Sequence, residues 1–156
     1  MSLRVRPASY SEILNAPNAE ALLAEYAAEC SIPGIGRINP QAEMYAAMEA
    51  AGFFRVMGAF DGDRLRGFAA VLTYLNPHYG LNLATVESLF LGAEYRNSRG
   101  GIELMGASEE HAEERNCETI LYSAPTGSQF ETLLSLRKNY HRTHSVFMRS
   151  LRPPRK

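Results

Sequence analysis

The strongest constraint on the fold is an alternating pattern that begins at residue 54. From Phe54 to Phe60, and again from Leu65 to Val71, every second residue is apolar or glycine. The turn sequence Asp61-Gly62-Asp63 stands between the two runs. Alternation with a period of two on both sides of such a turn predicts a β-hairpin, so part of the fold must be an antiparallel sheet.

Helices are predicted on the N-terminal side of this hairpin, after a short strand at residues 3–6. Ser9 followed by Glu12 is the pattern of a capping box, which satisfies the first free N–H groups of a helix. Residues 15–17 contain proline and interrupt that helix. The apolar positions after the interruption recur at helical spacing, and they are Leu22, Leu23, Tyr26 and Cys30.

Another helix is predicted to begin at Asn39-Pro40, where a cap precedes a proline, and to end at Gly52. After the hairpin, a turn at residues 76–80 leads into a strand over residues 83–91. A longer helix is expected from about residue 100 to residue 115, with small and apolar residues along one stripe. The small residues in that stripe would allow close packing on a sheet.

The remaining predicted elements are a strand at residues 119–122, a helix opened by the capping box Ser128 and Glu131, and a long strand over residues 140–151. Hairpins give antiparallel pairs, and a strand-helix-strand crossover gives a parallel pair. The sequence therefore predicts an α/β fold, with a mixed, mostly antiparallel sheet and helices on both faces. No repeat or linker divides residues 1–156, which we expect to form one domain.

The composition bounds the function. Apolar residues make up 46% of the chain and charged residues 21%, a balance typical of folded globular proteins. A net charge of −1 argues against a nucleic-acid partner, and no apolar run is long enough to suggest a membrane span. The N-terminus lacks the apolar stretch of a secretory signal, so the cytoplasm is the expected location.

No metal site is expected from the cysteines and histidines. Cys30 and Cys117 form no paired motif, and buried reduced thiols are the favoured interpretation, with a catalytic thiol as the minor alternative. His141 and His144 are three residues apart on a predicted strand, so they would point to opposite faces.

The most informative stretch is the predicted transition from strand to helix at residues 96–101. Its sequence is Arg96, Asn97, Ser98, Arg99, Gly100 and Gly101. A helix N-terminus presents free N–H groups and partial positive charge, glycine permits close approach of an anion, and arginine adds charged donors. These properties together favour a diphosphate site. An ordinary turn with solvated arginines is the alternative.

This stretch resembles the coenzyme-binding motif of the GNAT superfamily of N-acetyltransferases. The family pattern is Arg or Gln, two residues, Gly, one residue, and then Gly or Ala. Arg96 and Gly101 match the first and last positions, and Tyr95 matches the tyrosine that often precedes them. The order of predicted elements is also similar over roughly residues 3–151. Arg99 departs from the pattern because it stands where the family has its first glycine, which would strain a backbone that needs positive φ.

The resemblance implies a V-shaped cleft between two splayed strands, with acetyl-CoA as co-substrate. Backbone groups of Leu89, Phe90 and Leu91 would pair with the pantetheine arm, and the amides from Arg96 to Gly101 would hold the pyrophosphate. The implied chemistry is direct attack of a primary amine on the thioester, with a backbone N–H near Leu89 or Phe90 stabilising the oxyanion.

Glu87 is the predicted general base. We place it on one strand face with Thr85, Leu89 and Leu91, where apolar neighbours would desolvate it. A carboxylate that only reaches solvent or pairs with an arginine is the alternative. The family's usual acid, a tyrosine in the last helix, is replaced here by Ser135, so Tyr122, Tyr140 or a water would protonate the leaving thiolate.

The acceptor is not specified by the sequence. Residues 32–37 and the loop residues His78 and Tyr79 could line its pocket. A homodimer is possible because the long C-terminal strand would offer an edge. The alternative to an N-acetyltransferase is a non-catalytic module of the same fold that binds coenzyme A, which the residues Ser135 and Arg99 motivate.

Overall fold

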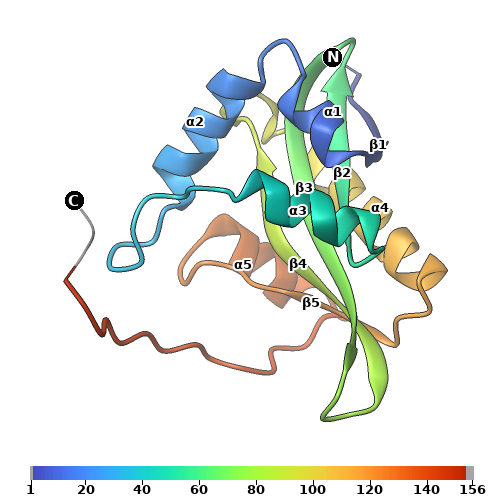
Figure 1. Cartoon of the computed structure of the whole chain (residues 1–156), viewed down its shortest axis with the longest axis vertical. Helices are drawn as coiled ribbons and strands as arrows, with labels where there is room; N and C mark the ends of the chain where they lie inside the picture. Colours follow the sequence, from blue (N-terminus) through green and yellow to red (C-terminus); the bar gives the residue numbers. More distant parts are fainter. Residues whose placement is uncertain (1, 154–156) are drawn as a thin grey trace.

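One five-stranded sheet organises the protein in the computed structural model, which describes residues 2–153 (Figure 1). The strands lie in the order β1-β2-β3-β4-β5, antiparallel except for the parallel pair β4–β5. Their bounds are β1 Arg4–Ala8, β2 Phe54–Asp61, β3 Arg64–Asn76, β4 Leu81–Leu91 and β5 Thr119–Tyr122. The predicted class, a mixed and mostly antiparallel sheet, is confirmed.

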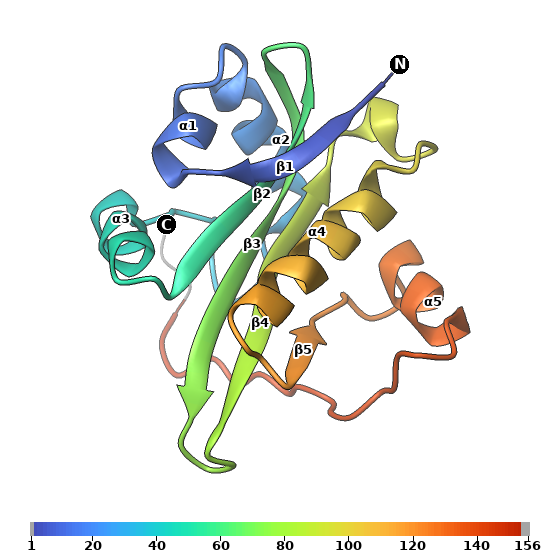
Figure 2. The same ribbon diagram turned by 90° about the vertical axis from the view of Figure 1, so that its right-hand side faces the viewer.

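Helices cover both faces of this sheet, as predicted (Figure 2). The helices α1, α2 and α3 lie on one face and α4 on the other, while α5 follows β5. Their bounds are α1 Tyr10–Leu14, α2 Ala19–Cys30, α3 Ala42–Ala50, α4 Gly100–Glu114 and α5 Gln129–Leu136, with a short 3-10 helix η1 at Ala93–Tyr95. None of the helices in the described part of the chain is long and apolar enough to cross a membrane.

Local sequence signals account for several element boundaries. The Ser9 Oγ accepts a hydrogen bond from the Glu12 amide at 3.0 Å, and the Ser128 Oγ accepts one from the Glu131 amide at 3.1 Å. Both predicted N-terminal caps are therefore confirmed. Gly62 lies in the tight β2–β3 turn with a φ of 63°, a left-handed conformation that residues with a Cβ adopt less readily than glycine.

The core has two layers, one on each side of the sheet. On the first face, Ile13 of α1 and Leu22 of α2 pack against aromatic residues of the strands. On the second face, the α4 stripe packs against the small and branched residues of β2, β3 and β4. Leu104 and Ser108 in this stripe are completely buried, as the sequence pattern predicts.

Three predictions about the elements are wrong. Helix α3 begins at Ala42 and not at Pro40, because Gln41 still has extended dihedral angles. The predicted strand over residues 140–151 is absent: the segment is extended, but it leaves the sheet and has no strand beside it, and a strand needs a neighbour for its hydrogen bonds. Cys30 is exposed and Cys117 half-buried, so neither is the buried thiol we expected.

Strands β3 and β4 lie close together at Gly67. This residue pairs with Leu91, and a Cβ built at Gly67 would lie 2.6 Å from the Phe90 carbonyl oxygen. A real Cβ almost never lies so close to a backbone atom. Gly106 on α4 is different, because a Cβ there would meet no atom within 4 Å.

These two glycines give a matched test of the packing between β3 and β4. We expect Gly67→Ala to lower the free energy of unfolding by about 1–3 kcal/mol, since the backbone of β4 must shift. We expect Gly106→Ala to raise it by roughly 0.5–1 kcal/mol, because alanine favours a helix more than glycine does. Urea unfolding followed by circular dichroism measures both. Equal effects of the two substitutions would contradict the close approach.

Candidate active site

The sheet opens where β4 and β5 part. Their parallel pairing runs from Leu83 opposite Thr119 to Val86 opposite Tyr122, and β5 then ends. Strand β4 continues to Leu91, so its last residues have a strand neighbour on the β3 side alone within residues 2–153. The pairing of β4 and β5 therefore ends at Val86, and the free edge from residue 87 to residue 91 can accept hydrogen bonds from an extended ligand.

A β-bulge at this point places Glu87 and Leu89 on opposite faces of the sheet. Ser88 pairs with Ala70 and Val86 pairs with Val71, so Glu87 is an extra residue without a partner on β3. A bulge interrupts the alternation of side chains. Glu87 therefore faces α3 on the first side of the sheet, whereas Leu89 packs on the α4 side. The prediction that Glu87 shares a face with Leu89 and Leu91 is wrong.

The carboxylate of Glu87 is held by a tyrosine that the sequence analysis did not assign to the site. The Tyr45 Oη of α3 donates a hydrogen bond to the Glu87 Oε1 at 2.9 Å. Tyr45 is itself fixed by the Tyr10 ring, with centroids 5.1 Å apart. Glu87 is exposed, so the desolvation expected for it is absent. Burial first, and then the hydrogen bond to Glu87, raise the pKa of Tyr45 well above its usual range.

A second tyrosine lies on the same side of β4. Burial raises the pKa of the Tyr26 hydroxyl, which a hydrogen bond to Ser88 partly offsets. The ring packs edge-on against Phe68 and Phe90, 5.1 Å and 5.4 Å away. The helical spacing in α2 predicted that Tyr26 belongs to the apolar stripe of this helix. No signal in the sequence indicated that Tyr26 would lie beside the bulge in β4. Tyr26, Tyr45, Glu87 and Ser88 thus border the open end of β4 from one side.

The turn before α4 presents free backbone donors. In the described chain, the N–H groups of Asn97, Arg99, Gly101 and Ile102 have no hydrogen-bond acceptor. The amides of Ser98 and Gly100 are used within the turn, by the Tyr95 carbonyl at 2.9 Å and the Ser98 Oγ at 3.1 Å. The Arg96 amide donates to the Ala93 carbonyl at 3.4 Å. The predicted set of pyrophosphate donors therefore loses Arg96, Ser98 and Gly100, and gains Ile102. Four free N–H groups beside a helix N-terminus form a site for an anion.

The backbone at Arg99 is unstrained. Its φ of −78° and ψ of −2° are helical, so the strain expected for an arginine in the glycine position is absent. The two glycines after it have different roles. A Cβ at Gly100 would lie 2.6 Å from Leu3 Cδ1, so Gly100 allows α4 to pack against the residue preceding β1. A Cβ at Gly101 would meet no atom within 4 Å, so this side of the helix start is open.

Arg96 is bound to its own protein. Its Nε donates to the Leu91 carbonyl at 2.9 Å, and its Nη2 lies 2.6 Å from a carboxylate oxygen of Glu29 on α2. The expectation of two free guanidinium groups is therefore wrong for Arg96, whereas Arg99 has no ion pair among residues 2–153. Both side chains of the Arg96–Glu29 pair are about 40% exposed. A pair of such exposure is weak, so an anionic ligand could replace Glu29.

The two tyrosines predicted as acids share one carboxylate. Tyr122 Oη donates to Glu109 at 3.1 Å, and Tyr140 Oη donates to the same Glu109 oxygen. Burial and then Glu109 raise the pKa of Tyr140 to about 12 and raise that of Tyr122 further. Both hydroxyls are therefore poor acids at neutral pH. Ser135, which we expected to stand in place of a tyrosine, donates to the Glu131 carbonyl of its own helix at 2.8 Å.

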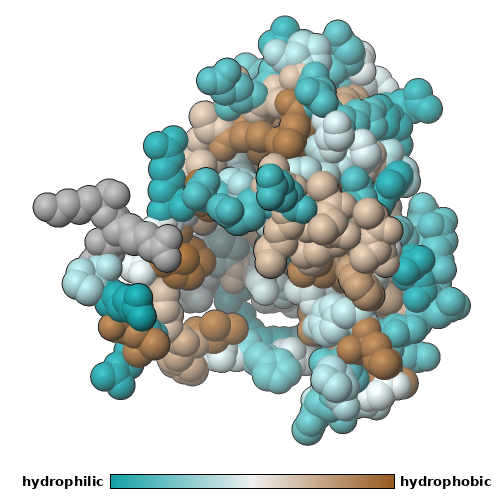
Figure 3. Space-filling view, in the orientation of Figure 1, coloured by the Kyte–Doolittle hydropathy of each residue, from teal (hydrophilic) through white to brown (hydrophobic). Residues whose placement is uncertain are grey.

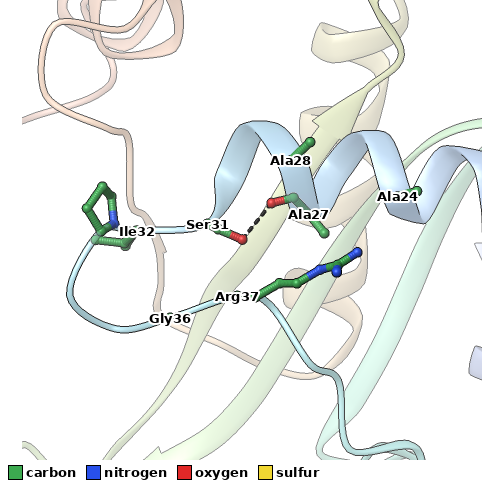
Figure 4. Close-up of a pocket in the computed structure, with 8 residues that line it drawn as sticks. Ala24, Ala27, Ala28, Ser31, Ile32, Gly36 and Arg37 are labelled. Carbon is green, nitrogen blue, oxygen red and sulfur yellow. Dashed lines mark hydrogen bonds between the residues drawn. The ribbon is translucent and has the colours of Figure 1, made fainter. Parts of the chain in front are cut away.

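A hollow of about 410 Å³ lies between α2 and the loop that follows it (Figure 4). Arg37 extends along α2 in this hollow, and the Ser31 Oγ donates to the Ala27 carbonyl at 2.5 Å. The prediction that residues 32–37 line a pocket fits this hollow, but His78 and Tyr79, in the turn between β3 and β4, are not part of its wall. The lining residues are Ala24, Ala27, Ala28, Ser31, Ile32, Pro33, Gly36 and Arg37.

Metal ligands do not gather in this region. No group of three or more His, Cys, Asp or Glu residues lies close enough to hold a metal ion in the residues that the structure describes. His141 and His144 lie on the extended segment after α5. The chemical groups of the site are therefore main-chain N–H groups, a carboxylate and tyrosine hydroxyls.

Several solved structures share this fold. An aminoglycoside acetyltransferase from an uncultured soil metagenomic sample, in complex with trehalose, superposes with a TM-score of 0.73 at 14% identity, over 96% of this chain and 97% of that one. A ribosomal-protein-alanine N-acetyltransferase from Brucella melitensis biovar Abortus 2308 has a TM-score of 0.69 at 18% identity, over 95% and 99%. AAC(6')-Iy in complex with the bisubstrate analogue CoA-S-monomethyl-acetylneamine also reaches 0.69, at 14% identity, over 97% and 99%.

The family follows from a match to the sequence itself. No curated protein sequence matches the chain. The sequence model of the acetyltransferase (GNAT) family, however, matches residues 19–130, which are more than half of the chain. The matched range includes the bulge at Glu87, the free edge of β4 and the turn before α4. The chain belongs to the GNAT acetyltransferase family, and its fold is that of the solved N-acetyltransferases of this type.

Proposed function

We propose that the protein transfers an acetyl group from acetyl-CoA to a primary amine by direct attack of the amine on the thioester. The observation that carries this proposal is the free edge of β4 beside four unbonded N–H groups at the start of α4. An extended pantetheine arm suits the first feature and a diphosphate suits the second. Family membership supports the same assignment.

The coenzyme would bind along residues 87–102. The free N–H groups of Asn97, Arg99, Gly101 and Ile102 would hold the pyrophosphate, and Arg96 would turn from Glu29 toward it. Leu89, Phe90 and Leu91 would pair through their backbone with the pantetheine. A backbone N–H near Leu89 or Phe90 would then stabilise the oxyanion that forms when the amine attacks.

Glu87 is the proposed base. Its carboxylate stands at the bulge, where β4 loses its β5 neighbour, and Tyr45 orients it. It would take the proton from the attacking amine, directly or through a water. Tyr45 is a positioning residue in this scheme, because its hydroxyl contacts Glu87 and not the acceptor. The acceptor would approach Glu87 from the side of the sheet that α2 and α3 cover.

The leaving thiolate would take its proton from water. Tyr122 and Tyr140 donate to Glu109, and Ser135 donates within its helix, so all three candidate hydroxyls are already bound. We infer that Tyr122 and Tyr140 fix β5 and the end of α5 to α4. Departure of the thiolate would then need no side-chain acid, because water can protonate a thiolate near neutral pH.

The second candidate is a coenzyme A-binding module without catalysis. The Arg96–Glu29 pair and the bound tyrosines favour it, because the Arg96 side chain is occupied by Glu29 and the candidate acids Tyr122 and Tyr140 are both bound to Glu109. The two candidates separate in one assay. Coenzyme binding without thiol release, on a panel of aminoglycosides, amino sugars and peptides with N-terminal alanine, would favour the module. The cytoplasm remains the predicted location, with neither nucleic acid nor membrane as an expected partner.

The first prediction concerns the coenzyme site. We expect Arg96→Ala to raise the dissociation constant of coenzyme A about tenfold, because one charged hydrogen bond is lost. We expect Glu29→Gln to lower it by up to about fivefold, because Arg96 no longer has to leave an ion pair. Calorimetric titration measures both. Glu20→Gln, also on α2, is the matched control. Weaker coenzyme binding in Glu29→Gln would contradict the idea that Glu29 and the pyrophosphate compete for Arg96.

The second prediction concerns the base. We expect Glu87→Gln to lower kcat by a factor of about 100 or more, because the amide cannot accept the proton, with little change in coenzyme affinity. We expect Tyr45→Phe to lower kcat less, since Glu87 stays but loses its orientation. Thiol release followed over a range of pH measures both. Glu43→Gln on α3 is the control, and full activity of Glu87→Gln would remove Glu87 from the mechanism.

The third prediction concerns the acid. We expect Tyr122→Phe and Tyr140→Phe each to keep kcat within about threefold of the parent while lowering the free energy of unfolding by about 1–2 kcal/mol, because a hydrogen bond to a carboxylate is lost. Steady-state rates and urea unfolding separate the two effects. A fall in kcat of about 100-fold in either variant, with stability unchanged, would instead identify that tyrosine as the acid.

A further inference from the structure

The turn that presents the free amides is short and depends on support from the elements around it. Between the end of β4 at Leu91 and the start of α4 at Gly100, the chain forms one short helix, the single turn η1. Inside the turn, the Tyr95 carbonyl accepts from the Ser98 amide and from the Ser98 Oγ. These bonds fix the shape of the turn. Its place relative to the free edge of β4 depends on what holds η1.

A carboxylate of α2 holds the first residue of η1. The Ala93 amide donates a hydrogen bond to the Glu25 Oε1 at 3.1 Å. The first N–H groups of a helix have no acceptor within the helix, so an oxygen from outside must supply one. Helix α2 also packs closely here, because a Cβ built at Gly92 would lie 3.9 Å from the Glu25 Oε2 and 3.5 Å from the Leu22 Cδ1. Helix α2 therefore contacts the point where β4 passes into η1.

Two carboxylates of α2 act on this turn, and they bind different groups. Glu25 and Glu29 are four residues apart on the helix, so they lie on the same face. Glu29 binds the Arg96 side chain, which the proposed coenzyme would draw away. Glu25 binds a main-chain amide that is not among the proposed pyrophosphate donors. The contact between Glu25 and Ala93 is therefore compatible with a bound coenzyme.

The strands hold η1 from another direction. The Tyr95 Oη donates to the Asp61 Oδ2 at 3.0 Å, and the Gly92 amide donates to the Arg66 carbonyl at 2.8 Å. Asp61 and Arg66 belong to the β2–β3 hairpin, so these bonds do not depend on α2. Loss of the Glu25 side chain would consequently leave η1 attached to the sheet. The turn would shift without unfolding.

The hydrogen bond of Glu25 and its charge have opposite effects on an anionic ligand. The bond fixes the turn, whereas a carboxylate repels the diphosphate that the turn would hold. Hydrophilic side chains border the outer edge of α2 on the face shown in Figure 3, so water and salt screen part of this repulsion. A neutral amide side chain could accept the same hydrogen bond without the charge. Substitution by glutamine and by alanine therefore separates the two effects.

We propose that Glu25 is a positioning residue for the coenzyme. Through the Ala93 amide it sets the place of η1, and thereby aligns the free amides before α4 with the free edge of β4. This inference rests on the proposed function, in which those amides hold the pyrophosphate. Glu25 contacts none of the reacting atoms, so it governs the affinity for acetyl-CoA and not the rate of acetyl transfer. Glu29 yields Arg96 to the ligand, whereas Glu25 stays bound.

Coenzyme affinity in two variants tests this role. Glu25→Ala raises the dissociation constant of coenzyme A, and the KM for acetyl-CoA, about fivefold to tenfold, while kcat stays within about twofold. Glu25→Gln keeps an acceptor oxygen and binds coenzyme A at least as tightly as the parent. Calorimetric titration and thiol release measure these constants. Asn18→Ala is the matched structural control: the Asn18 side chain bonds the Leu65 backbone at 2.7 Å and 2.9 Å, so its loss lowers stability and leaves the dissociation constant unchanged.

A proline at residue 93 tests the route through the amide. Ala93→Pro removes the N–H that donates to Glu25, and proline is accepted at the first position of a helix. In this background Glu25→Ala changes the dissociation constant of coenzyme A by less than about twofold, because the bond is already absent. The full effect of Glu25→Ala in both backgrounds overturns the proposal. Equal tightening by Glu25→Ala and Glu25→Gln also overturns it, since charge alone would then act.

The same titrations distinguish failure of this role from failure of the proposed function. A parent protein that binds no coenzyme A overturns the proposed function, and the role of Glu25 with it. A parent that binds coenzyme A, with Glu25→Ala binding equally tightly, overturns the role of Glu25 alone. A loss of affinity in Asn18→Ala as large as that in Glu25→Ala also overturns it, because general loosening of α2 would then explain both.

Discussion

The site depends on the early end of the parallel pair β4–β5. Four residue pairs join the two strands, and β4 then runs on to Leu91 without β5. If β5 continued beside it, the N–H and C=O groups from residue 87 onward would be used within the sheet. Because β5 stops at Tyr122, that edge is free, and it leads to the unbonded amides at the start of α4. An extended ligand with a diphosphate at one end fits both features together.

The bulge at Glu87 separates the face of its carboxylate from the face of Leu89. A regular strand would continue the alternation from Thr85 through Glu87 to Leu89. Glu87 keeps the face of Thr85, toward the tyrosines of α2 and α3, and the extra residue moves Leu89 to the α4 side. Glu87 therefore lies at the start of the free edge of β4 and faces α2 and α3. Helix α2 contributes both to the turn before α4 and to the hollow, since Glu29 binds Arg96 and the neighbouring alanines line the hollow.

Much of the fold was predictable because its signals are local. Hairpins, capping boxes and the α4 stripe depend on residues within a few positions of one another, and the Ser9 and Ser128 caps and the β2–β3 hairpin appear as predicted. The final strand was predicted wrongly for the same reason. Residues 140–151 have the extended character of a strand, but only a neighbour makes a strand, and the described chain supplies none.

The sequence by itself determined the class of fold, the family motif at residues 96–101 and the place of Glu87 before the end of β4. The tertiary structure decided which groups remain free for chemistry. Tyr45 reaches Glu87 from 42 residues away, Glu29 reaches Arg96 from 67, and Glu109 binds Tyr140 from 31. Such partners are brought together by packing of helices on the sheet. No spacing along the chain encodes them, because each depends on the relative positions of elements that meet only in the folded protein.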